Sequence, residues 1–132
     1  MQDTSTEPLK PYCLSVEIRG LPKTYNQLTS AHWRVRSTES KKWHREIWAL
    51  IPIERRPKKP LPKARLTLTR HSLKPPDPDG LVSTFKYPLD ALVTCGILEN
   101  DRFENIGMPT YLWMKAETRK DQMIRIDVTE RL

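Results

Sequence analysis

The chain has 132 residues, of which 30% are charged and 37% hydrophobic, and its formal net charge is +7. This length buries one sizeable core and seldom two, so we expect a single domain over residues 1–132, with residues 1–10 as a flexible polar leader. The absence of a signal-peptide core and of any run of roughly 20 apolar residues excludes a membrane helix and predicts a cytoplasmic protein.

The first half of the sequence predicts two strands and one helix. Apolar and polar residues alternate over 12–20 and again over 64–71, which is typical of half-buried strands. Between them, Ser37 or Thr38 can cap a helix that runs to Leu50 and ends at Pro52. Its apolar positions Trp43, Ile47, Leu50 and Ile51 have helical spacing, and the connection over 53–63 is proline-rich and basic.

The second half predicts a helix and two further strands. A helix from Asp79 to about Gly96 places apolar side chains on one side, and Asp79 itself can cap it. Pro88 should kink this helix or shift its start. Residues 111–117 and 123–130 are predicted to close the fold as a β-hairpin. The fold class expected is therefore α+β, a small domain with a mixed sheet and helices packed on it.

Basic and acidic residues are divided unevenly along the chain. Residues 1–76 contain 16 Lys and Arg against 6 Asp and Glu, whereas residues 77–132 contain 7 against 10. Such a density of cations suits a polyanion, because each neutralised phosphate releases condensed counterions. A solvated basic loop is the alternative. The residues expected to contact nucleic acid are Arg34, Arg36, Lys41, Lys42, Arg45, Arg70 and Lys74.

Two carboxylates follow the basic half directly, in the sequence "PPDPDG". In an extended segment Asp77 and Asp79 point to the same side, near enough for one cation, and Pro78 stiffens the pair. Ordinary turn composition is the alternative interpretation of the same residues.

Three more charged residues, one lysine and two aspartates, follow this acidic pair. Lys86 and Asp90 follow Asp79 at seven and eleven residues, so a continuous helix would bring all three to one face. Asp101 comes just after the helix and would supply the third carboxylate from another element, as a hard dication requires. Asp90 has the alternative role of a helix-surface partner for Lys86.

The combination of these motifs resembles the RusA family of Holliday junction resolvases, which are found in bacteria and on phages or prophages. The resemblance covers most of the chain: the "LPKTYN" loop with Asn26, a basic helix, "DPDGLVSTFKYPLDAL", and "GILENDRF". It departs at two positions: the family has Asn where this chain has Gly80, and an acidic residue where this chain has Asn100. The spacing of seven residues from Asp79 to Lys86 is also longer than the family's usual four.

The resemblance implies a Mg²⁺-dependent endonuclease that resolves four-way junctions, as a homodimer, by paired nicks. It implies Asp77, Asp79 and Asp101 as metal ligands and catalytic residues, with Mn²⁺ able to substitute, and Lys86 as the catalytic lysine. Asp90 and Asn26 would support the site. It also implies a bacterial or phage-infected host cell as the setting. The alternatives are a non-catalytic basic nucleic-acid-binding module and a related nuclease that prefers flaps or other branched DNA.

Overall fold

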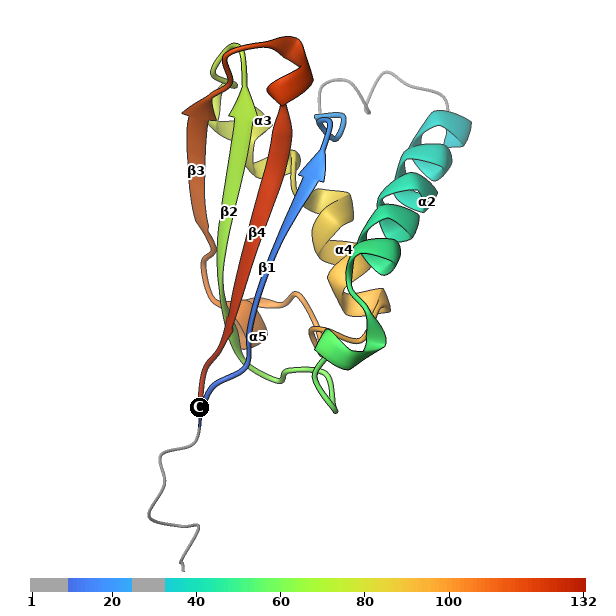
Figure 1. Ribbon diagram of the computed structural model, residues 1–132, viewed down its shortest axis with the longest axis vertical. Helices are drawn as coiled ribbons and strands as arrows, with labels where there is room; N and C mark the ends of the chain where they lie inside the picture. The colour runs from blue at the N-terminus through green and yellow to red at the C-terminus, as the bar shows by residue number, and fades with distance from the viewer. Residues whose placement is uncertain (1–9, 25–32) are drawn as a thin grey trace, which may run out of the picture.

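A computed structural model describes residues 10–24 and 33–132 (Figure 1). The strands of this part form a mixed sheet in the order β1-β4-β2-β3, in which only the β2–β3 pair is parallel. The strand bounds are β1 Cys13–Arg19, β2 Ala64–Ser72, β3 Thr110–Lys115 and β4 Met123–Glu130. The expected α+β class with a mixed sheet is confirmed.

The longer helices lie on one side of this sheet, and α2 packs along α4 (Figure 1). The helices are α2 Trp33–Leu50, α3 Pro78–Ser83, α4 Lys86–Thr94 and α5 Phe103–Ile106, with short 3-10 turns η2 Ile53–Arg55 and η3 Arg119–Asp121. Among the described residues, no helix combines the length and the apolar character needed to cross a membrane.

The core lies between the sheet and these helices. In β1, Leu14, Val16 and Ile18 are buried while the residues between them are exposed, as the alternating pattern predicts. From the helix side, Trp43 and Ile47 of α2 are fully buried. Burying side chains of this size contributes roughly 2 kcal/mol each, so this two-layer contact is the main stabilising feature of the fold.

The predicted closing hairpin is wrong, because β2 lies between β3 and β4. β3 is parallel to β2, and a parallel pair requires a long crossover, which α3, α4 and α5 provide. The turn-like segment after β3 then passes the end of β2, where the amide of Ala116 donates to the carbonyl of Ser72. β4 consequently enters between β1 and β2 and is hydrogen-bonded on both sides.

Two helix boundaries also differ from expectation. The helix α2 already includes Trp33, so Ser37 and Thr38 are interior residues, although the end before Pro52 is confirmed. The single helix predicted from Asp79 is two helices separated at Thr84 and Phe85. Pro88 explains the break: it cannot donate to the carbonyl of Thr84, whereas in the first turn of a new helix no intrahelical donor is needed.

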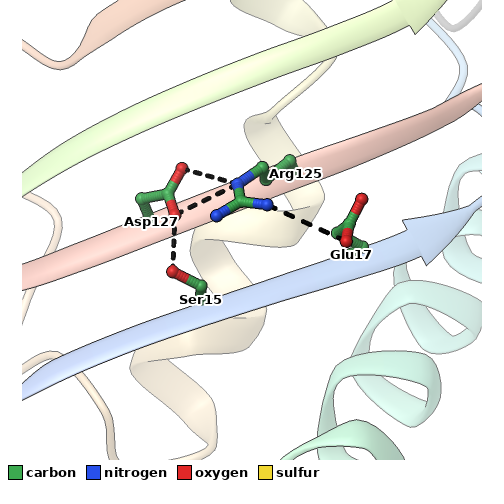
Figure 2. A network of polar contacts seen from close by, with 4 residues as sticks. All are labelled: Ser15, Glu17, Arg125 and Asp127. Carbon is green, nitrogen blue, oxygen red and sulfur yellow. Dashed lines mark hydrogen bonds and ion pairs between the residues drawn. The ribbon is translucent and has the colours of Figure 1, made fainter.

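The opposite face of the sheet carries a polar network (Figure 2). Arg125 of β4 lies 3.8 Å from Glu17 and 3.1 Å from Asp127, and the hydroxyl of Ser15 donates to Asp127 at 2.6 Å. Burial raises the pKa of Asp127, but hydrogen bonds from Arg125 and Ser15 outweigh it and leave the pKa below its ordinary value. These residues tie β1 to β4 on the side that the helices leave open.

Candidate functional site

The Asp77–Asp79 turn starts helix α3. Asp77 is the N-cap residue, and its Oδ1 accepts a hydrogen bond of 2.6 Å from the amide of Gly80. Asp77 rather than Asp79 caps the helix because Pro78 holds the preceding residue in the extended conformation that an N-cap needs. Asp79 therefore lies in the first turn, and both carboxylates are exposed.

Gly80 is fitted to this cap. A Cβ at that position would lie 2.8 Å from Asp77 Oδ1 and 3.4 Å from the Cβ of Pro76. A larger residue would force the capping carboxylate to move. The glycine found where the RusA pattern has Asn is thus matched to the way this chain places Asp77.

A buried hydrogen-bond network holds the turn against the end of the sheet. Arg70 Nη1 donates to the hydroxyl of Thr84 at 2.8 Å, and this hydroxyl donates to the carbonyl of Gly80 at 2.7 Å. Ser72 accepts from the indole of Trp113 at 2.9 Å and donates to the carbonyl of Lys74 at 2.7 Å. Both ends of the segment that contains the acids are therefore fixed by buried hydroxyls.

Arg70 is half-buried and belongs to this network. It shares the inward side of β2 with Leu66 and Leu68, and burial lowers the pKa of its guanidinium. Within residues 10–24 and 33–132, no carboxylate pairs with it. Its Nε and Nη1 hydrogen-bond to Ser72 and Thr84, and its role as a nucleic-acid contact stays a prediction.

The two aspartates of the turn lack a salt-bridge partner in the described part of the chain. None of the salt bridges among the described residues includes Asp77 or Asp79. Other exposed carboxylates, such as Glu46, Glu99 and Asp101, also form no salt bridge among the described residues. Asp77 and Asp79 lie two residues apart and offer carboxylate oxygens, the donor type that Mg²⁺ prefers.

Lys86 and Asp90 lie on α4 and so do not share one helix with Asp79. The expected common face of these three residues is lost because of the break between α3 and α4. Burial raises the pKa of Asp90, while the charge of Lys86 opposes the shift, Asp101 adds to it and His44 opposes it. Asp90 is thus within electrostatic reach of Lys86, as its alternative role supposed.

Asp101 lies at the other end of the sheet from the Asp77–Asp79 turn. The segment before it is anchored at Leu61, whose amide and carbonyl bond to Ile97 and Glu99 at 2.9 Å each. Leu61 precedes β2 and Asp77 follows it, and the nine residues of β2 span about 26 Å at about 3.3 Å per residue. Figure 1 shows α3 beside the end of β2 and α5 beside its start.

The expected triad of Asp77, Asp79 and Asp101 is therefore not brought together within one chain. Among the described residues, no group of three or more His, Cys, Asp or Glu side chains could hold a metal ion. Asn100 in turn uses its side-chain oxygen to accept from the amide of Asp101 at 2.8 Å. The physical reason is the layout of the crossover, which carries the chain the length of the sheet between residues 77 and 101.

The basic residues predicted to contact nucleic acid are otherwise exposed. Along α2 these are Arg34, Arg36, Lys41, Lys42 and Arg45, and Lys74 precedes the acidic turn. Arg34 lies 5.4 Å from the ring centroid of the exposed Trp33. Asn26 lies outside the described residues, as do residues 1–9 of the predicted leader.

Sequence reasoning missed the network under the turn and one aromatic contact. The position of Arg70 could have been found, because it continues the inward alternation of Leu66 and Leu68 in β2. No local signal identifies Thr84 as its partner. The guanidinium of Arg56 lies 3.9 Å from the ring centroid of Trp48, which a separation of eight residues across a helix end does not predict.

No protein-family model matches the chain, and a search of curated proteins finds no relative. The resemblance to RusA resolvases therefore rests on the motif residues themselves.

Proposed function

We propose that this chain binds branched DNA and cleaves it as a Mg²⁺-dependent, structure-specific endonuclease of the RusA type. The observation that carries the proposal is the pair of exposed carboxylates, Asp77 and Asp79, on a turn that hydrogen bonds of Thr84 and Gly80 anchor; neither carboxylate has a salt-bridge partner among the described residues. The exposed cations of α2 supply the sequence-independent attraction to phosphates.

The donor set of the turn fits Mg²⁺. This ion is often held by one or two carboxylates and completes its shell with water and substrate phosphate oxygens, so Asp77 and Asp79 are sufficient protein ligands. When bound, Mg²⁺ polarises the scissile phosphodiester and lowers the pKa of a bound water. Lys86 at the start of α4 is the proposed counter-charge for the phosphate oxygens.

A homodimer is the proposed working form. A four-way junction has two-fold symmetry, and two copies related by the same symmetry present one site to each of two opposed strands. Sedimentation velocity on the free chain and on the chain with a junction tests this part. A monomer under both conditions refutes the paired-nick scheme without refuting single nicking.

A second function is favoured by one specific observation, the separation of Asp101 from Asp77 and Asp79. On that basis the chain is a non-catalytic basic module that binds branched nucleic acid, and the turn is only a helix cap. A preference for flaps over four-way junctions is a third outcome of the same assay.

The deciding experiment compares Asp77→Asn and Asp79→Asn with the natural chain. Asn caps a helix as well as Asp does, so Asp77→Asn removes the charge and keeps the cap. Asp121→Asn is the matched control, because Asp121 is also an exposed aspartate that accepts bonds in a cap, at Thr118.

Cleavage of a four-way junction, a flap and a linear duplex is measured in Mg²⁺ and in Mn²⁺, and Mn²⁺ binding is measured by calorimetry. The nuclease proposal expects metal binding and junction cleavage that both turn variants lose and Asp121→Asn retains. Tight junction binding without cleavage in either metal establishes the binding module instead. No binding to any branched substrate refutes both functions.

A further inference from the structure

A groove of about 730 Å³ lies between α2 and the C-terminal end of α4. One wall is the side of α2 that carries Lys41, His44, Arg45 and Trp48, and the other is formed by Thr94 and Cys95. Its volume is within the usual range for small-molecule sites, and its lining is mainly apolar. The groove is remote from the Asp77–Asp79 turn, since α3 and that turn lie beyond the opposite end of α4.

Trp48 is an ordered aromatic surface on this groove. Trp48 is 55% exposed, yet the guanidinium of Arg56 lies over the ring at 3.9 Å from the centroid. Arg56 is itself fixed, because Nε donates to the carbonyl of Ile51 at 2.9 Å and Nη2 to that of Trp48 at 3.1 Å. An exposed indole held in place loses little conformational entropy when a flat apolar group stacks on it.

Two cations stand at the edge of the same groove. Lys41 and Arg45 are four residues apart on α2, and both are exposed. No salt bridge of the described residues uses either of them. The groove therefore presents an apolar, aromatic surface next to positive charge, which is complementary to a nucleobase and its phosphate.

We propose that this groove binds one unstacked nucleotide of DNA, with the base against Trp48 and the adjacent phosphate held by Lys41 and Arg45. The inference rests on the nucleic-acid binding of the proposed function but not on cleavage. A bulge, flap or junction offers unpaired or easily unstacked bases, whereas a continuous duplex does not. The groove would thus recognise the unpaired base at a branch, in addition to the general attraction of the α2 cations for DNA phosphates.

The test uses two DNA duplexes that differ only in whether a 2-aminopurine base is bulged or paired. Binding constants are measured at one fixed salt concentration, together with the quenching of 2-aminopurine fluorescence by stacking. The natural chain is expected to bind the bulged probe about tenfold more tightly and to quench it, as base–aromatic stacking predicts. Trp48→Leu is expected to abolish the preference, whereas Trp48→Phe retains most of it.

Trp33→Leu is the matched control, because Trp33 is an exposed tryptophan of α2 outside the groove. The double variant Lys41→Gln/Arg45→Gln should bind the bulged probe more weakly than the double variant Lys58→Gln/Lys59→Gln does. A folded Trp48→Leu chain that keeps the preference overturns the proposal, and so does equal binding of both probes by the natural chain. Failure of the natural chain to bind either probe also overturns this inference, while the four-way junction and flap assay decides nucleic-acid binding separately.

Discussion

The hydroxyl of Thr84 is expected to contribute strongly to stability through the network under the Asp77–Asp79 turn. Thr84 is 0% exposed and joins the Arg70 guanidinium to the carbonyl of Gly80. Thr84→Val keeps the shape and removes both hydrogen bonds. The neutral bond is worth about 1 kcal/mol and the bond to the half-buried cation about 1.5 kcal/mol, the low end of the range for charged groups, so the free energy of unfolding should fall by about 2–3 kcal/mol.

Urea titration followed by tryptophan fluorescence measures this loss, and the melting temperature should fall by about 10 °C. Thr94→Val is the matched control, because Thr94 makes a similar bond to the carbonyl of Asp90, at 3.0 Å, on an exposed helix face. It should cost less than about 0.5 kcal/mol. Equal losses in the two variants would refute the reasoning that the network under the turn is a buried, cooperative unit.

Three further predictions concern single side chains. Gly80→Ala should displace the carboxylate of Asp77 and cost about 1 kcal/mol, measured by urea unfolding; an unchanged midpoint would show that the cap tolerates a Cβ. Asp90→Asn should raise the melting temperature at pH 7 but not at pH 3, because burial raises the pKa of Asp90 and its ionised form opposes folding; an equal effect at both pH values contradicts this. Asp127→Asn should destabilise the chain at pH 7, because the ionised carboxylate of Asp127 accepts a hydrogen bond from Arg125. The loss should shrink as the pH falls through the lowered pKa of Asp127. Thermal melts over that pH range should therefore show the melting temperatures of the variant and of the natural chain converge.

The elements with strong periodicity could be predicted from sequence. Alternation identified β1 and β2, because a half-buried strand must place every second side chain in the core. The end of α2 followed from Pro52, whose ring excludes helical continuation. The exposure of the α2 cations followed from their placement opposite Trp43 and Ile47.

The pairing of strands could not be predicted in the same way. β3 and β4 look like neighbours in a hairpin, since the connection between them is short and turn-like. Whether a strand pairs with its sequence neighbour depends on which edge of the sheet is open when it arrives, and that is a property of the assembled sheet. The same assembly brings the half-buried Arg70 to Thr84, a hydrogen bond that no local pattern predicts.

By itself, the sequence determined the α+β class and the basic face of α2, and it placed a helix cap in the acidic turn although at Asp79 instead of Asp77, because each of these depends on residues within a few positions of one another. Only the tertiary structure decided that Asp101 lies far from Asp77 and that Trp48 meets Arg56 above a groove. These relations depend on the path of the chain over the whole length of the sheet, and no spacing along the sequence encodes that path.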